Sequence, residues 1–181
     1  MEQSIPATAA RRRHRVLLVE DQTAIRQMLG VVLTAAPDFV VVGEAADGAE
    51  ALVLLRRHQP DVIVLDWKFP CGGGGAFLRA MREERLQGQV LVMSACTGQA
   101  EIREALMMGA KGYVEKGAEL DEFMLALRTV AEGGVHFCPV VAGVVEQMVK
   151  RTARARTAAP SDTETAQRAA GAATTTALRA T

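Results

Sequence analysis

Five short apolar runs recur along this chain, and they constrain its fold more than any other feature of the sequence. Most of them are continuous and rich in β-branched side chains, and they span residues 16–19, 39–42, 62–65, 90–93 and 113–114. Continuous apolar runs, unlike alternating ones, are typical of strands buried on both faces of a parallel sheet. The runs therefore predict five strands inside a layered domain.

The segments between and after these runs carry the spacing of amphipathic helices. The apolar repeats cover 25–33, 51–55, 77–81, 102–106 and 120–130. Asp47 is placed to cap the second helix at its N-terminus, and Gly109 is placed to end the fourth. Five strands that alternate with five helices predict an α/β fold: a doubly wound, five-stranded parallel sheet with right-handed crossovers and helices on both faces.

The composition is that of an ordinary globular protein without a bias toward a charged partner. The 181 residues are 49% apolar, 23% charged and 4% aromatic, with a formal net charge of zero. Neither charge nor aromatic content favours binding to nucleic acid or to an anionic membrane. The cysteines, Cys71, Cys96 and Cys138, are too scattered for a disulfide framework or a metal-ligand pattern. No transmembrane run or secretory signal is evident, so we expect a cytoplasmic protein.

The two ends of the chain differ from its middle. Residues 1–14 form a polar arm that we expect to be disordered, and residues 151–181 form an Ala- and Thr-rich tail with the same expectation. Within 133–150, an apolar stripe from Val141 to Val149 follows a Gly-Gly pair and predicts a separate linker helix. The five predicted strands and the five helices that alternate with them lie in 15–132, which we interpret as one domain.

Reactive side chains follow four of the predicted strands at the point where each strand ends. Glu20 and Asp21 follow the first, Asp66 the third, Ser94 the fourth and Lys116 the fifth. In an open parallel α/β sheet, ligands bind outside the carboxyl ends of the strands, so these side chains are expected to converge at one edge.

The chemistry of this set is coherent. Crowded carboxylates repel one another, and Mg²⁺, which prefers oxygen ligands, would neutralise them. One carboxylate could then attack a phosphoryl group as a nucleophile while the ion offsets the developing charge. Ser94 could donate a hydrogen bond to the transferred group, and Lys116 would supply a compact positive charge.

Taken singly, each residue also has a simpler interpretation. Asp21 could cap the first helix, Glu20 could be a solvated loop acid, and Lys116 could be an ordinary surface lysine. A simpler interpretation does not suit Asp66, because this residue follows a wholly apolar strand, where a charge without a function is costly.

The glycines at 72–75 are not followed by the Lys-Ser/Thr of a phosphate-binding loop, so we interpret them as a flexible loop before the third helix.

The motifs around these residues resemble the response regulator receiver family over about 15–132. Glu20-Asp21 follow VLLV, Asp66 lies in VIVLDWKFP, Ser94 lies in VLVMSA, and GYVEK ends in Lys116. The resemblance implies a flavodoxin-like receiver with strand order 2-1-3-4-5. It implies that Asp66 accepts a phosphoryl group from a sensor histidine kinase or a phosphotransfer protein. The implied Mg²⁺ ligands are Glu20, Asp21, Asp66 and the backbone carbonyl of Lys68.

The same resemblance assigns a switch to Ser94 and Tyr113. Ser94 would move toward the phosphoryl group and the Tyr113 ring would turn inward, which repacks the fourth helix, fifth strand and fifth helix. Lys68 and Cys96 lie where the family tunes phosphoryl lifetime. Gly117 follows Lys116 where many relatives have proline.

The segment GGVHFCPVVAGVVEQM resembles the linker of transcription regulators of the NarL/LuxR type, in which a helix-turn-helix domain follows. The remaining residues lack a recognition-helix pattern. We therefore expect a regulator that acts through a protein-interaction surface of its receiver, without direct DNA binding. The alternative is a truncated or divergent NarL/LuxR-type transcriptional regulator. The linker helix would pack on the receiver or pair with a second chain in a homodimer.

Two other classes fit parts of the pattern. Phosphatases of the haloacid dehalogenase type also use a strand-end Asp nucleophile, but they place a second Asp two residues later, where this chain has Lys68. An interaction module that is never phosphorylated would not require all five site residues. We expect a phosphoacceptor that catalyses only its own phosphorylation and dephosphorylation, not a metabolic enzyme.

Overall fold

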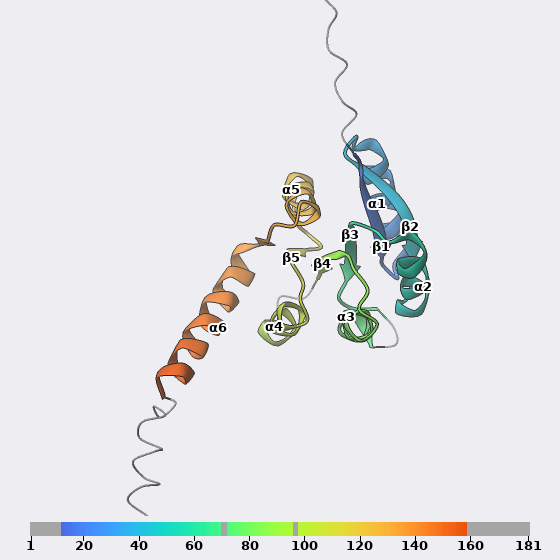
Figure 1. Cartoon of the computed structure of the whole chain (residues 1–181). Helices are drawn as coiled ribbons and strands as arrows, with labels where there is room; N and C mark the ends of the chain where they lie inside the picture. The colour runs from blue at the N-terminus through green and yellow to red at the C-terminus, as the bar shows by residue number, and fades with distance from the viewer. Residues whose placement is uncertain (1–11, 70–71, 96–97, 159–181) are drawn as a thin grey trace, which may run out of the picture. The chain divides into compact units, whose positions relative to one another are not determined.

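The computed structural model describes residues 12–69, 72–95 and 98–158 (Figure 1). The chain divides into two compact units, Met1–Ala142 and Gly143–Thr181. The elements in order are β1 (His14–Val19), α1 (Thr23–Ala35), β2 (Phe39–Ala45), α2 (Gly48–His58), β3 (Val62–Asp66), α3 (Gly73–Glu83), β4 (Gln89–Ser94), α4 (Gln99–Met107), β5 (Gly112–Glu115), α5 (Leu120–Ala131), β6 (His136–Phe137) and α6 (Pro139–Ala158).

A parallel sheet with strand order β2-β1-β3-β4-β5-β6 forms the centre of the first unit. The predicted order of the first five strands is confirmed, and all the pairings are parallel. The sheet has one strand more than the five expected, because His136 and Phe137 pair with Gly112 and Tyr113. This two-residue strand is too short to leave an apolar run in the sequence, and it lies inside the segment predicted to be a linker.

Both faces of the sheet are buried, as the continuous apolar runs predict. On one face, α1 and α5 pack over alternate strand residues such as Val16, Val64 and Leu91. The intervening residues, including Leu17 and Ile63, are equally buried on the face that α2, α3 and α4 cover (Figure 1). This two-sided packing fixes the strand ends that carry the candidate site.

The structure confirms the predicted ends of two helices. The Asp47 side chain accepts a hydrogen bond from the Glu50 backbone N–H at 2.9 Å and so caps α2. Gly109 follows α4 with φ of +100°, and its N–H donates to the Leu106 carbonyl at 3.0 Å. A glycine in this left-handed conformation ends the helix without a Cβ penalty.

The prediction that 72–75 form a flexible loop is wrong for Gly73, Gly74 and Gly75, which are buried in the first turn of α3. A Cβ on Gly73 would lie 2.7 Å from the Trp67 backbone oxygen, and one on Gly74 would lie 2.7 Å from Trp67 Cε3. Close packing of α3 against Trp67 therefore explains Gly73 and Gly74, and it overrides their low helix propensity.

The boundaries at the two ends also differ from expectation. His14 begins β1, whereas the sequence predicts that it ends the disordered arm; residues 1–11 of that arm lie outside the described residues. The segment 133–150 contains β6 as well as the first part of α6. The helix continues to Ala158, into the predicted tail, and the remainder of that tail is not described.

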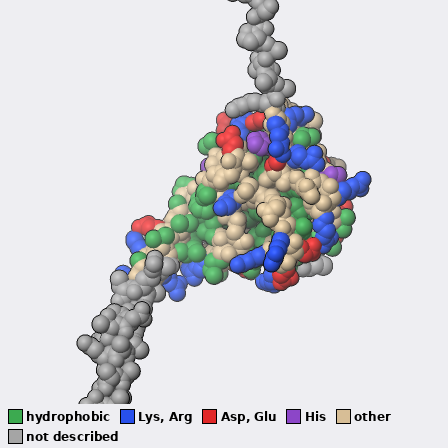
Figure 2. All heavy atoms as spheres, in the orientation of Figure 1, with side chains coloured by type: hydrophobic (Ala, Val, Ile, Leu, Met, Phe, Trp, Pro, Cys, Tyr) green, Lys and Arg blue, Asp and Glu red, His purple; other side chains and the backbone are tan. Residues whose placement is uncertain are grey.

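The surface carries charges of both signs. Acidic and basic side chains are interspersed on the face shown in Figure 2, in keeping with a formal net charge of zero. Within the described ranges, no helix is both long enough and apolar enough to cross a membrane.

Candidate functional site

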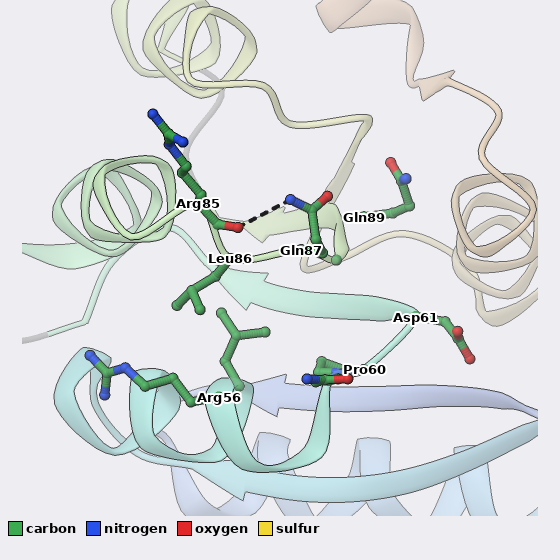
Figure 3. A pocket seen from close by; sticks show the side chains of 10 residues that line it. Arg56, Pro60, Asp61, Arg85, Leu86, Gln87 and Gln89 are labelled. Atoms are coloured by element: carbon green, nitrogen blue, oxygen red, sulfur yellow. Dashed lines mark hydrogen bonds between the residues drawn. The ribbon is translucent and has the colours of Figure 1, made fainter.

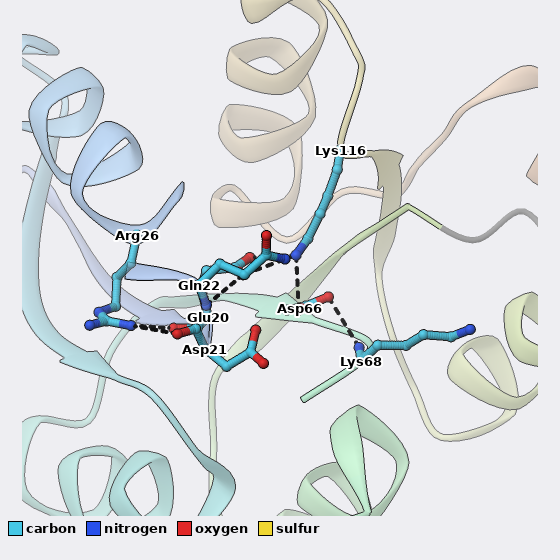
Figure 4. Close-up of polar contacts among 7 residues, drawn as sticks. All are labelled: Glu20, Asp21, Gln22, Arg26, Asp66, Lys68 and Lys116. Carbon is cyan, nitrogen blue, oxygen red and sulfur yellow. Dashed lines mark hydrogen bonds and ion pairs between the residues drawn. The ribbon is translucent and has the colours of Figure 1, made fainter. Parts of the chain in front are cut away.

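The parallel sheet brings the predicted residues together at the carboxyl ends of its strands (Figure 4). Backbone hydrogen bonds continue the pairing beyond the strand ends. The Trp67 N–H donates to the Met93 carbonyl at 3.2 Å, and the Lys116 N–H donates to the Ser94 carbonyl at 3.0 Å. These bonds hold the residues after β3 and β5 in fixed positions beside β4.

Burial distinguishes this edge from the rest of the described chain. Glu20, Asp66 and Ser94 are the polar or charged side chains that are buried among the described residues, and their exposed fractions are 1%, 2% and 0%. A buried carboxylate is costly unless it is paired or coordinates a metal. The concentration of all three at one set of strand ends therefore indicates a functional site.

Lys116 supplies the direct positive partner. Its Nζ lies 2.9 Å from Asp66 Oδ2 and 2.8 Å from Glu20 Oε2. Burial disfavours the charged ammonium, but hydrogen bonds to Glu20 and Asp66 outweigh it and raise the pKa of Lys116 above its ordinary value. The ammonium therefore stays charged and bridges the two buried carboxylates.

Glu20 has a pKa above its ordinary value. Burial is the main cause, the hydrogen bond from Lys116 acts in the opposite direction, and the charge of Asp66 adds to the rise. The backbone N–H of Gln22 also donates to Glu20 Oε1 at 3.2 Å. The hydrogen bond from Lys116 thus does not fully offset the cost of burying the charged form of Glu20.

The donor set fits a hard divalent cation. Glu20, Asp21 and Asp66 each offer a carboxylate oxygen, and these atoms lie within 4.8 Å of one another. Asp21 Oδ1 is buried and has no hydrogen-bond partner among the described residues. Three carboxylates against one ammonium leave two negative charges, which a single divalent ion would balance.

Ser94 and Tyr113 are both fully buried and come from neighbouring strands. The switch that the resemblance assigns to this pair, with the Tyr113 ring turning inward on phosphorylation, stays a prediction. The Cys138 N–H donates to the Tyr113 carbonyl at 3.4 Å, directly after β6. Tyr113 therefore sits where β5 joins the additional strand.

Arg26 is a supporting residue that the sequence did not reveal. Its Nη1 donates to the Glu20 backbone carbonyl at 2.6 Å, and Figure 4 shows it beside the loop that carries Glu20 and Asp21. Arg26 therefore fixes the backbone that presents the two acids. A single arginine within an amphipathic helical repeat gives no signal of such a contact.

Lys68 contributes at two points. Its backbone N–H donates to Asp66 Oδ1 at 3.1 Å, so its main chain lies beside the carboxylate. Its side chain extends away from Asp66 (Figure 4), and Nζ pairs with Glu101 Oε1 at 3.1 Å in the first turn of α4. Cys71 and Cys96 lie outside the described residues.

A hollow of about 530 Å³ lies at the other end of the sheet (Figure 3). It is lined by residues from the ends of α2 and α3 and from the segments that lead into β3 and β4, including Arg56, Asp61 and Gln89. None of the strand-end acids lines it, so it is separate from the candidate site.

Comparison with known proteins agrees with this fold. Residues 16–128 match the response regulator receiver domain family. The chain therefore belongs to the receiver domain family of response regulators, the proteins of two-component signalling.

Several curated relatives are of the NarL/LuxR type. The chain is 34% identical over 118 residues to the nitrate/nitrite response regulator protein NarL of Escherichia coli K12, a match that covers 65% of this chain and 55% of the relative. It is 29% identical over 127 residues to the transcriptional regulatory protein DegU of Brevibacillus brevis, covering 70% and 54%. The chain thus spans little more than half the length of these relatives.

A crystal structure with the same fold is the LuxR-family two-component response regulator from Aurantimonas sp. SI85-9A1. It superposes with a TM-score of 0.70 at 30% sequence identity, over 76% of this chain and 99% of that chain.

Proposed function

We propose that Asp66 is the phosphoacceptor of this receiver. The observation that carries the proposal is the position of Asp66, which is 2% exposed at a strand end with one carboxylate oxygen 2.9 Å from Lys116 Nζ. Asp66 Oδ2 would attack phosphorus as the donor's bond to phosphorus breaks, and the leaving group would keep the electron pair. Lys116 and Ser94 would then bind the phosphoryl oxygens.

The ligands proposed for Mg²⁺ are Glu20, Asp21, Asp66 and the backbone carbonyl of Lys68. The unpartnered Asp21 Oδ1 and the close approach of the three carboxylates support this set. When bound, the ion would neutralise charge on the transferred group. The proposed phosphoryl donor is a sensor histidine kinase or a phosphotransfer protein, and the only catalysis proposed is of the protein's own phosphorylation and dephosphorylation.

The test is to incubate the chain with acetyl phosphate and Mg²⁺ and to follow addition of one phosphoryl group by intact mass. We expect labelling of the wild type, loss of labelling in Asp66→Asn, and normal labelling in Asp47→Asn. The last variant is a matched control because Asn caps a helix as well as Asp does. Equal labelling of Asp66→Asn would overturn the proposal.

Transcriptional regulation is a second candidate, because the named relatives NarL and DegU are regulators. The output proposed first is a protein-interaction surface that changes when Ser94 and Tyr113 repack. The two candidates differ in DNA affinity: a regulator that binds DNA directly would show steeply salt-dependent binding. Absence of such binding in both the labelled and the unlabelled chain would favour the protein-interaction output.

A further inference from the structure

Two lysines flank Asp66: the side chain of Lys116 points toward its carboxylate, and that of Lys68 points away from it (Figure 4). Lys116 reaches the carboxylate with its ammonium group, 2.9 Å from Oδ2. Lys68 contacts the other oxygen through its backbone N–H, which donates to Oδ1, while its Nζ is paired with Glu101 on α4. The second lysine is therefore beside the acceptor carboxylate but is turned away from it.

We propose that Lys68 exchanges ion partners when Asp66 is phosphorylated, leaving Glu101 for the phosphoryl oxygens, and that Glu101 thereby sets the lifetime of the acyl phosphate. Glu101 is a positioning residue in this scheme, because it acts only through Lys68. The inference rests on the proposed phosphoacceptor role of Asp66.

The Lys68–Glu101 pair is suited to exchange. The Lys68 side chain is 59% exposed and that of Glu101 is 30% exposed, whereas Lys116 is 11% exposed. Water screens the exposed Lys68 ammonium and so weakens the pair, which lets it break readily. A phosphoryl group carries more charge than one carboxylate and offers three strong acceptor oxygens. Lys68 would therefore prefer it, and its flexible four-carbon stem allows the change by rotation alone.

The same movement would obstruct hydrolysis. A hollow of about 500 Å³ is lined by the two residues that follow Asp66 in the chain, Trp67 and Lys68, and also by Asp21, Glu101 and Glu104. In hydrolysis, a water oxygen bonds to phosphorus as the bond from phosphorus to the Asp66 oxygen breaks. Asp66 recovers its carboxylate, inorganic phosphate leaves, and a proton passes to solvent. Lys68 turned onto the phosphoryl group would occupy the side from which this water arrives.

The experiment compares hydrolysis rates of chains that are already labelled. Wild type and the variants Glu101→Gln, Lys68→Gln, the double variant and Glu104→Gln are labelled with acetyl phosphate and Mg²⁺. The donor is then removed, and loss of the phosphoryl group is followed by intact mass. Glu104→Gln is the matched control, since it removes the same charge from the same hollow one helical turn away.

We expect Glu101→Gln to slow hydrolysis by up to roughly fivefold, the range that an exposed ion pair provides. Lys68→Gln should hydrolyse faster than wild type, the double variant should match Lys68→Gln, and Glu104→Gln should match wild type. An unchanged rate in Glu101→Gln would overturn the inference. The inference would also be overturned if Glu101→Gln slowed hydrolysis equally in the Lys68→Gln background. Glu101 would then act on the phosphoryl group directly through its charge and not through Lys68. If wild type takes no label, the phosphoacceptor assignment itself fails.

Discussion

The ammonium group of Lys116 joins two buried carboxylates from different strands, with Nζ 2.9 Å from Asp66 Oδ2 and 2.8 Å from Glu20 Oε2. This contact connects the end of β1 with the ends of β3 and β5. It therefore contributes both to the charge balance of the site and to the stability of the sheet edge.

Lys116→Gln should destabilise the metal-free protein by about 3 kcal/mol, because it leaves Glu20 and Asp66 buried without their cation. Mg²⁺ should stabilise this variant more than it stabilises the wild type, because the ion no longer competes with an ammonium group. Denaturant unfolding with a chelator and with Mg²⁺ measures both effects. The exposed Lys111 provides the control, and Lys111→Gln should stay within about 0.5 kcal/mol of the wild type. Unchanged metal-free stability in Lys116→Gln would contradict the role of the bridge.

Gly74→Ala should destabilise the protein by about 1–3 kcal/mol, since the new methyl group would overlap the Trp67 ring. The indole must move or α3 must shift, so the emission of Trp67 should change as well. Thermal unfolding and tryptophan fluorescence together test this. Gly143→Ala should leave the emission unaltered, because a methyl group on this helical glycine would meet open space among the described residues. If Gly74→Ala had the thermal stability and the Trp67 emission of the wild type, the packing explanation would be refuted.

Much of the fold and the site could be predicted because both follow from local patterns. The apolar runs identify buried parallel strands, and the strand-end rule then places Glu20, Asp66, Ser94 and Lys116 at one edge. What could not be predicted depends on contacts between distant elements. The pairing of Lys68 with Glu101 depends on the direction in which a long side chain turns, which carries no periodic signal.

The glycines of α3 show the same limit for backbone structure. Local propensity assigns Gly73 and Gly74 to a loop, yet tertiary packing against Trp67 places them in a helix. Strand β6 was missed for a related reason, since His136 and Phe137 are defined as a strand only by their pairing with β5.

Asp38→Asn should lower stability at neutral pH by up to about 1 kcal/mol. Arg128 Nε donates to Asp38 Oδ2 at 2.6 Å and holds the pKa of this carboxyl below its ordinary value. A lowered folded-state pKa means that the stabilisation is present above the ordinary Asp value and is lost as pH falls through the folded-state value. The stability difference should therefore shrink under acid. Denaturant unfolding across this pH range measures it, and a difference that grows on acidification would contradict the ion pair.

Arg128→Gln provides the matched second variant for this pair. Each single change removes the same contact between α5 and the turn before β2, so the double variant should lose little more than either alone. Additive losses would show that the two side chains act independently.

Mg²⁺ should produce a saturable change in Trp67 fluorescence, because the indole is 6% exposed and follows the acceptor carboxylate directly in the chain. Asp21→Asn removes one proposed ligand charge and should shift the titration to higher Mg²⁺ concentration, while Asp47→Asn should titrate like the wild type. Identical curves for Asp21→Asn and wild type would remove Asp21 from the ligand set. A flat response in all three proteins would instead favour an interaction module that works without metal or phosphate, since the site would then not respond to the ion at all.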